Sequence, residues 1–272
     1  MLSSAVLGSL ATAQVVVRAG FDRSEVHRAR AAGPLRLLTP RAAGRAAWVV
    51  TSSLGGGLVH GDNVACEIAI HPGATCVITT QSSTKAYRGT TSQQLRVRAL
   101  GDATALIVPD PIVPYRDATF TQLTSIELDA SASLALVDVV TAGRVAHGER
   151  WSATRFDSTL SISLDGTRRL VDRFVLDPED GSLARRLGRF EAIGTVVICG
   201  PRVDLIATAQ LAALAEIPVR RDDPVIIAGS PFATGAMFRI AGDRVHAVVE
   251  TTRELLREVC RAVGEDPWSR KF

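Results

Sequence analysis

The sequence predicts a mainly β protein, built as a large β-sandwich-like or helical stack of many short strands with two α-helices. Short runs of alternating apolar and polar residues recur along the chain, each bounded by turn-forming residues. Only two windows place apolar residues at helical spacing. Hydrophobic residues make up 46% of the 272 residues, which suffices for a substantial core. Because no low-complexity linker interrupts the chain, we expect a single domain over residues 1–272.

The N-terminal segment is apolar, and Ala11-Thr12-Ala13 is similar to a signal-peptidase site. It lacks a basic start and is diluted by Ser and Thr, so a first strand through Val15–Val17 is a better interpretation than a cleaved signal peptide.

A hairpin is expected between Asn63–Ile70 and Thr75–Thr80. The turn at residues 71–74, His-Pro-Gly-Ala, would place residue 70 opposite residue 75. Cys66 would then lie opposite Thr79, and Cys76 opposite Ala69. This register puts the two thiols on opposite faces of the hairpin, so it predicts that they form no disulfide.

The remaining elements are mostly strands. Asp165-Gly166 is a type I′ hairpin signal between two of them. Strands are expected at Gln94–Leu100, Ala103–Val108, Thr119–Leu128, Ser133–Val140, Leu160–Leu164, Arg169–Val175, Gly194–Cys199, Val225–Ala228, Ala236–Ile240 and Arg244–Glu250. We find no internal repeat.

Two helices are expected. Asp204–Ile217 is rich in Ala and Leu, with Asp204 as its cap and Pro218 as its stop. Thr252–Val263 follows a capping box of Thr251 and Glu254 and ends at Gly264.

Charge and cysteine content restrict the function classes. Residues 1–100 carry 11 Lys and Arg against 4 Asp and Glu, whereas residues 101–200 carry 10 against 14. Aromatic residues are only 5%, which argues against a nucleic-acid binder, and no apolar run is long enough for a membrane helix. The four cysteines form no C-x-x-C motif and are too few for a disulfide scaffold, so we expect free thiols and a cytoplasmic protein.

The common enzyme motifs are missing from the sequence. Gly55-Gly56-Gly57 leads into a strand and is not followed by the Lys of a phosphate loop. Ser230 lacks the G-x-S-x-G elbow, and the five histidines never fall at zinc-site spacing. The sequence therefore predicts a protein that is not an enzyme.

Two segments are unusual in another way. Residues 54–62 read Leu-Gly-Gly-Gly-Leu-Val-His-Gly-Asp, and residues 79–88 read Thr-Thr-Gln-Ser-Ser-Thr-Lys-Ala-Tyr-Arg. The second segment offers many hydrogen-bonding groups and little apolar surface. From the residues alone it is either a solvated crossover between strands or a protein-contact surface.

These segments resemble the UreD family of urease accessory proteins, called UreH in some bacteria. Two further motifs complete the resemblance in the family's order: Pro-Asp-Pro-Ile-Val-Pro-Tyr at residues 109–115 and Gly-Arg-Val-Ala-His-Gly-Glu at residues 143–149. The resemblance covers most of the chain and rests on general layout after about residue 200. His60 departs from the small residue that is common at its position.

The resemblance implies a β-rich fold with two helices and a non-enzymatic urease maturation factor. Such a factor binds the urease apoprotein and recruits a UreF-like accessory protein, which in turn docks a UreG-like GTPase for nickel delivery. No tightly bound cofactor is implied; nickel(II) would be carried transiently, through an internal passage lined by polar and acidic groups. Ions in transit need weak, exchangeable oxygen ligands, which this sequence offers. The alternative is a generic β-sandwich protein-binding scaffold with no role in metal transfer.

The candidate site consists of the motif residues. Those expected to bind a partner or to serve the structure are Gly56, Gly57, Gly61, Thr80, Gln81, Lys85, Tyr87, Arg88, Pro109, Asp110 and Arg144. Those expected along a transient nickel path are Asp62, Glu149 and His60. Alternatives remain open for each of the three: Asp62 as a turn cap, Glu149 as an ion-pair partner of Arg144 or Arg150, and His60 as a hydrogen-bonded surface histidine.

Overall fold

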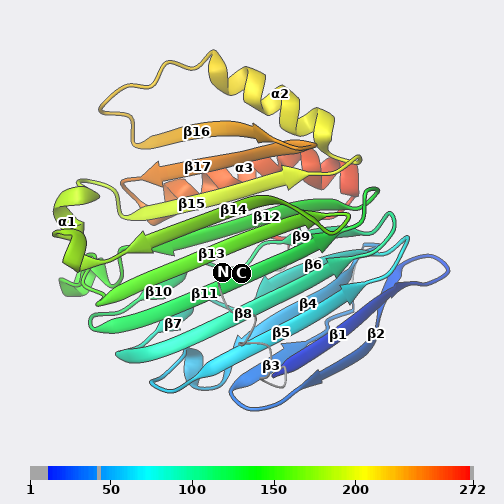
Figure 1. The fold of residues 1–272 in the computed structure, drawn as a ribbon, viewed down its shortest axis with the longest axis horizontal. Coiled ribbons are helices and arrows are strands. Elements are labelled where there is room, and N and C mark those ends of the chain that lie inside the picture. Colours follow the sequence, from blue (N-terminus) through cyan, green and yellow to red (C-terminus); the bar gives the residue numbers. More distant parts are fainter. Residues whose placement is uncertain (1–11, 42–43, 270–272) are drawn as a thin grey trace.

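The computed structural model describes residues 12–41 and 44–269, and its strands form two facing sheets (Figure 1). Sheet A contains, in spatial order, β14 (Thr167–Leu176), β13 (Arg155–Leu164), β11 (Ala118–Leu128), β8 (Gly89–Ala99), β5 (Asn63–Ile70), β1 (Ala13–Ala19) and β2 (Ser24–Ala31). Sheet B contains β16 (Val225–Phe232), β17 (Gly235–Gly242), β15 (Ala192–Cys199), β12 (Ser133–Thr141), β9 (Thr104–Ile107), β6 (Thr75–Thr80), β4 (Ala47–Ser53) and β3 (Leu35–Leu38), with β7 (Thr84–Ala86) and β10 (Ile112–Pro114) beside it. The predicted mainly β architecture is confirmed.

The central part of the chain winds between the two sheets as a stack of parallel coils. Consecutive strands from β4 to β13 alternate between sheet B and sheet A, apart from the short strands β7 and β10. Each strand pairs in parallel with the strand one coil further on, at an offset of 29 residues: Ala47 with Cys76, Asn63 with Ser92, Thr75 with Thr104, Gly89 with Ala118 and Thr104 with Ser133. The last coil is longer, because Thr119 of β11 pairs with Arg155 of β13. A structural repeat is therefore present where the sequence showed none.

Aspartates hold one set of corners of this stack. At each of three corners, a backbone N–H donates to the carboxylate of an aspartate that follows about one coil later. The pairs are Gly73 with Asp102 at 2.6 Å, Gly101 with Asp129 at 2.6 Å and Ala130 with Asp165 at 2.8 Å. These bonds satisfy corner amides that the sheet ladders leave unpaired.

Antiparallel strands and helices complete the fold. β2 and β14 close the two edges of sheet A, and β15, β17 and β16 extend sheet B. Helix α2 (Asp204–Ala215) packs on β15–β17, and α3 (Val245–Val263) packs on β12, β15 and β17, so both cover the outer face of sheet B. A four-residue helix, α1 (Leu183–Arg186), precedes β15, and 3₁₀ turns lie at Leu54–Gly56, Val145–His147 and Pro178–Asp180.

Two apolar clusters result. The inter-sheet core lies between sheets A and B, and the helix-side core lies between sheet B and the helices. No helix in the described residues is both long and apolar enough to cross a lipid bilayer.

The predicted hairpin of Asn63–Ile70 with Thr75–Thr80 is wrong. β5 belongs to sheet A and β6 to sheet B, so the turn at residues 71–74 carries the chain between sheets. Cys66 and Cys76 consequently point into the same inter-sheet core, not to opposite faces. Both thiols are free and buried, and burial raises the pKa of each.

The predicted strand at Arg244–Glu250 is also wrong, because these residues form the first turns of α3. Val248 packs where Gly194 and Gly242 leave room; a Cβ on either glycine would lie 3.0 or 2.5 Å from the valine side chain. Thr251 is thus inside the helix, and its hydroxyl donates to the Ala247 carbonyl rather than capping a helix start. The stop at Gly264 is confirmed, with a φ of +76°.

Most other sequence predictions agree with the structure. The expected first strand lies within β1, and α2 lies within the predicted range but ends before Ile217. The prediction of Asp204 as the cap is wrong: the cap position is Val203, and Asp204 is the first residue of the helix. Asp165 and Gly166 both have positive φ, as a type I′ turn requires. Strands β2, β3, β4, β7 and β10 had no sequence prediction.

Candidate functional site

The four sequence motifs meet at one corner of the coil stack. Leu58 donates its N–H to the carbonyl of Lys85 at 2.8 Å, which joins the glycine-rich motif to β7. β7 pairs in parallel with β10, and the N–H of Tyr115 donates to the carbonyl of Ala86 at 2.9 Å. β10 in turn pairs with β12, which leads into the Gly143–Glu149 motif. Segments spread between residues 54 and 149 of the sequence therefore become neighbours in successive coils.

One side-chain column runs through these motifs. The rings of Tyr87 and Tyr115 pack edge to face, with centroids 5.0 Å apart. The guanidinium of Arg144 lies 4.3 Å from the centroid of the Tyr115 ring. We call Gly57, Tyr87, Tyr115, Arg144 and Glu149 the corner column, because each motif contributes at least one member.

Gly57 makes room for the first ring of the column. A Cβ at Gly57 would lie 2.5 Å from Cε2 of Tyr87 and 2.7 Å from the carbonyl oxygen of Lys85. The need for glycine at this position is a close approach, since its φ of 173° is ordinary extended backbone. Gly56 and Gly61 have a different requirement, because their φ values of +75° and +90° are in the left-handed region.

Glu149 terminates the column in an ion pair. Nε of Arg144 donates to Oε2 of Glu149 at 2.9 Å, and an Nη of the same guanidinium donates to Oε1. The pairing with Arg144, one of the two partners considered for Glu149, is the one observed. The arginine hydrogen bonds hold the pKa of the Glu149 carboxyl below its usual value. Both carboxylate oxygens are thus engaged by a cation of the chain.

The other two residues predicted for a nickel path also have structural contacts. Oδ2 of Asp62 accepts the N–H of Val59 at 2.8 Å, the geometry of a turn cap. Nδ1 of His60 accepts the N–H of Thr90 at 3.0 Å. Within residues 12–41 and 44–269 there is no group of three or more His, Cys, Asp or Glu side chains placed to hold a metal ion together.

The remaining motif residues divide between the surface and the interior. Arg88 is exposed, with Nε 3.9 Å from a carboxylate oxygen of Asp117. Gln81 is exposed, and its N–H donates to the Thr51 carbonyl at 2.9 Å. Lys85 is half-buried beside Gly57.

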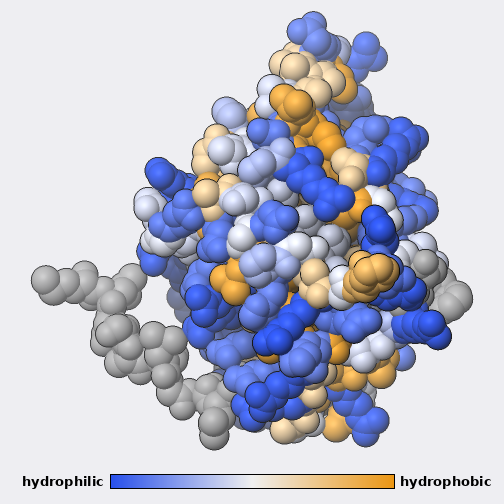
Figure 2. All heavy atoms as spheres, turned by 90° about the vertical axis from the view of Figure 1, so that its right-hand side faces the viewer, coloured by the Kyte–Doolittle hydropathy of each residue, from blue (hydrophilic) through white to orange (hydrophobic). Residues whose placement is uncertain are grey.

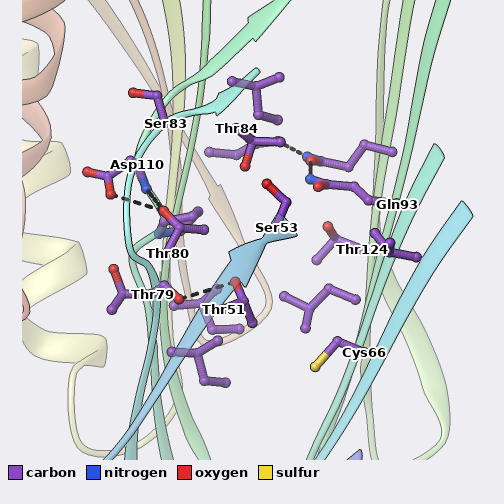
Figure 3. Close-up of a pocket in the computed structure, with 18 of the residues that line it drawn as sticks. Thr51, Ser53, Cys66, Thr79, Thr80, Ser83, Thr84, Gln93, Asp110 and Thr124 are labelled. Carbon is purple, nitrogen blue, oxygen red and sulfur yellow. Dashed lines mark hydrogen bonds between the residues drawn. The ribbon is translucent and has the colours of Figure 1, made fainter. Parts of the chain in front are cut away.

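Thr80, Pro109 and Asp110 line a cavity of about 130 Å³ between the two sheets, which also reaches the exposed Ser82. Figure 3 shows Thr80 and Asp110 in contact on one side of the cavity and Gln93, Thr124 and Cys66 on the opposite side. The hydroxyl of Thr80 donates to Oδ2 of Asp110 at 3.0 Å and accepts the Asp110 N–H at 2.7 Å. The polar groups that line the cavity are thus mostly hydroxyl, amide and carboxylate oxygens. Oxygen ligands of this kind bind cations weakly.

A row of polar side chains continues from this cavity through the inter-sheet core. On sheet A, Gln93, Gln122 and Ser158 are register partners on β8, β11 and β13. On sheet B, Asp138, Thr195 and Arg239 are register partners on β12, β15 and β17. The side chain of Gln122 bonds to that of Gln93 and donates to Oδ2 of Asp138 at 2.6 Å. We call these six residues and Asp172 the polar row.

Asp138 is the most perturbed acid of the row. It faces sheet A from the middle of β12, where it touches both the cavity and a second, smaller one. Burial raises the pKa of its carboxyl to about 6, against the opposing hydrogen bonds from Ser158 and Gln122 and the charge of Arg239. The group therefore changes charge near neutral pH.

An ion pair between the sheets closes the far end of the row. Arg239 on β17 donates to both carboxylate oxygens of Asp172 on β14, at 2.7 and 2.8 Å, and to the Thr195 hydroxyl at 2.7 Å. Both bonds to Asp172 come from one guanidinium nitrogen, Nη2, so this charge-assisted pair links β14 of sheet A to β17 of sheet B.

The sequence prediction missed the polar row, although a signal was present. Gln122 falls on the same strand face as Phe120 and Ile126, and Asp138 falls on the face of Leu136 and Val140. A polar residue on the apolar face of an alternating strand marks a buried polar group.

Comparison with known proteins identifies relatives of the whole chain. The family model described as UreD urease accessory protein matches residues 9–271. A urease accessory protein UreD of Sorangium cellulosum (strain So ce56) is 38% identical over 267 residues, covering 97% of this chain and 85% of the relative. A protein of the same name from Anaeromyxobacter sp. (strain Fw109-5) is 36% identical over 270 residues, covering 94% and 91%. Urease accessory protein D of Arabidopsis thaliana is 30% identical over 294 residues, covering 96% and 100%.

Proposed function

Because the chain belongs to the UreD family of urease accessory proteins, we propose that it acts in urease maturation as a non-catalytic factor. In this proposal it binds the urease apoprotein and recruits a UreF-like protein, which docks a UreG-like GTPase. In the same proposal its place of action is the cytoplasm.

The corner column is the observation that carries the proposal. The four motifs of the resemblance, distant in sequence, form one continuous side-chain stack at a single corner. Tyrosine and arginine are the residues that most often dominate protein–protein interfaces. The ordered column gives a partner a rigid surface, which lowers the entropy cost of binding.

Nickel delivery is the finer part of the proposal. A cation between the sheets would meet oxygen atoms of Thr80, Asp110, Gln122 and Asp138 in succession. Oxygen ligands such as these exchange quickly on a nickel ion. A nearby carboxylate also offsets part of the free-energy cost of desolvating a divalent ion. Nickel(II) is the cargo in this scheme and is held only transiently. The residues proposed for the nickel path are therefore Asp110 and Asp138, because both line the cavity between the sheets. Asp62 and Glu149 do not line it; they cap a turn and pair with Arg144.

The test uses co-expression of the chain with urease subunits, the UreF-like protein and the UreG-like GTPase. We expect wild-type protein to co-purify with this assembly. The double substitution Asp110→Asn and Asp138→Asn should leave co-purification intact but lower nickel per urease active site. A matched control, Glu67→Gln with Glu127→Gln, removes two carboxylates from the outer face of sheet A, where they pair with Arg96 and Arg98.

Three outcomes separate the parts of the proposal. Failure of the wild-type chain to co-purify would refute the maturation role. Normal nickel content with normal assembly in the Asp110/Asp138 variant would reject the conduit and leave the alternative, a binding scaffold with no role in metal transfer. Equal nickel loss in the control variant would attribute the effect to general electrostatics.

A further inference from the structure

A second surface, far from the motifs in sequence, has the features of a docking element. The β1–β2 hairpin forms the edge of sheet A, and its turn places Phe21 fully exposed to solvent. In Figure 1 this turn projects at the right-hand side; Figure 2 faces that side and shows largely hydrophilic surface with isolated apolar groups. A fully exposed aromatic ring at the tip of a tight turn buries nothing within the described chain.

The hairpin and the segment after it are strongly basic. Residues 18–45 contain seven arginines and only two carboxylates, Asp22 and Glu25. Asp22 is engaged by Arg23 at 3.0 Å, so it offsets little of the remaining charge. Arg18, Arg28 and Arg30 are exposed along the hairpin. Their charge gives the hairpin a positive potential that attracts and orients an acidic partner.

The backbone of β2 offers hydrogen bonds as well. Among the described residues β2 pairs with β1 alone as a strand, and the N–H of Ser24, at its start, donates to the Arg45 carbonyl at 2.7 Å. Beyond Ser24, the other edge of β2 presents N–H and C=O groups. Residues 27–31 are exposed on both faces of the strand. An exposed sheet edge of this kind accepts an additional strand from another chain.

We propose that the β1–β2 hairpin docks an acidic, extended segment of a protein partner, which adds a strand beside β2 and covers Phe21. The segment's carboxylates pair with Arg18, Arg28 and Arg30, and a small apolar pocket of the partner receives the Phe21 ring. The proposal rests on the proposed function for the identity of the assembly that supplies the segment. It is distinct from the corner column, whose members lie just after the 3₁₀ turn Leu54–Gly56 and in the segments that follow β7, β10 and β12.

The test compares three variants of the full chain for binding to the assembly of urease apoprotein and UreF-like protein. The reversal Arg18→Glu, Arg28→Glu and Arg30→Glu should weaken binding at least tenfold. It should also flatten the decline in affinity that wild-type protein shows as NaCl is raised. Phe21→Ser should weaken binding several-fold and keep that salt dependence. The control Arg168→Glu, Arg169→Glu and Arg185→Glu changes three exposed arginines at or beyond the opposite edge of sheet A and should bind as wild type.

Hydrogen exchange gives an independent readout. Within residues 27–31, the amides that face away from β1 should exchange quickly in the free full-length chain and slowly in the assembly. The amides bonded to β1, and that of Ser24, which donates to the Arg45 carbonyl at 2.7 Å, are protected in both. Unchanged exchange of the amides that face away from β1, or equal binding by folded wild-type and reversal variants, would overturn the proposal even if the assembly forms. A lipid surface is the competing partner. If the wild-type chain bound phosphatidylserine vesicles, the arginine reversal abolished that binding, and both bound the protein assembly equally, the proposal would be overturned in favour of a lipid surface.

Discussion

The two cores on either side of sheet B differ in what they bury. The helix-side core packs apolar side chains such as Phe238, Val248 and Leu256 against the sheet. The inter-sheet core contains a similar apolar cluster but also the polar row and its cavities. The helix side of sheet B also buries Thr252 and Glu265, but each of these bonds to nearby backbone. Burying polar groups costs free energy even when they are paired, so the connected row of polar side chains between the sheets points to a role beyond stability. The three predictions below test this difference.

The largest effect is expected in the helix-side core. Phe238→Ala removes a fully buried ring on β17 that contacts the helix-side cluster. We expect a loss of about 3–5 kcal/mol in the free energy of unfolding, measured by urea denaturation. A loss below about 1 kcal/mol would show that α2 and α3 are not packed on the sheet as the structure has them.

The Asp138→Asn substitution is expected to raise stability relative to wild type, and the size of this gain should depend on pH. The Asp138 pKa is about 6 in the folded chain and about 3.9 in an unfolded one. Between these values the folded protein retains a proton that the unfolded chain releases, so this group's stabilising contribution is complete below pH 4 and is lost as pH rises through 6. The loss is at most about 3 kcal/mol.

The Asp138→Asn variant lacks this titration, so its stability relative to wild type should rise between pH 4 and pH 7. Urea unfolding at a series of pH values measures the difference, with Asp222→Asn at an exposed aspartate as the control. Parallel pH profiles for wild type and the Asp138 variant would contradict the buried placement of this carboxylate.

The smallest effect is expected at the corner column, outside both cores. Gly57→Ala forces a Cβ against the Tyr87 ring and the Lys85 carbonyl, and should cost about 1–3 kcal/mol of stability. Adding Tyr87→Ala should recover part of this loss, because the ring is one of the two obstructions. Thermal unfolding of the two single variants and the double variant measures the coupling; strict additivity would contradict the contact.

Local periodicity predicted most strands but not their partners. Alternation in Asn63–Ile70 identifies its buried face correctly, since Val64, Cys66 and Ile68 point into the inter-sheet core. The turn at residues 71–74 has the composition of a hairpin loop, yet it turns the chain onto the other sheet. Pairing is set by contacts between coils 29 residues apart, and these coils share backbone geometry more than residue identity.

Tertiary contacts also explain the sequence errors at α3 and at the site. The three valines at positions 245, 248 and 249 favour a strand locally, but Val248 of the helix packs into the space that Gly194 and Gly242 leave on sheet B. The motif residues were found, whereas their arrangement as a column was not, because residues 57, 87, 115 and 144 approach only after the coils stack. Gln122 and Asp138 lie in no motif. In the sequence they can be recognised only because each falls on the apolar face of an alternating strand.

The 29-residue offset has a consequence for how the chain folds. Within the stack, every new strand finds its partner one coil back, already synthesised, so coils can be added in the order in which the ribosome releases them. β1 is the exception: Ala13 pairs with Cys66, so the first strand must wait for β5 before it has a parallel neighbour. We expect the β1–β2 hairpin to join the stack only once β5 has been synthesised, and its exposed arginines to keep the waiting segment soluble.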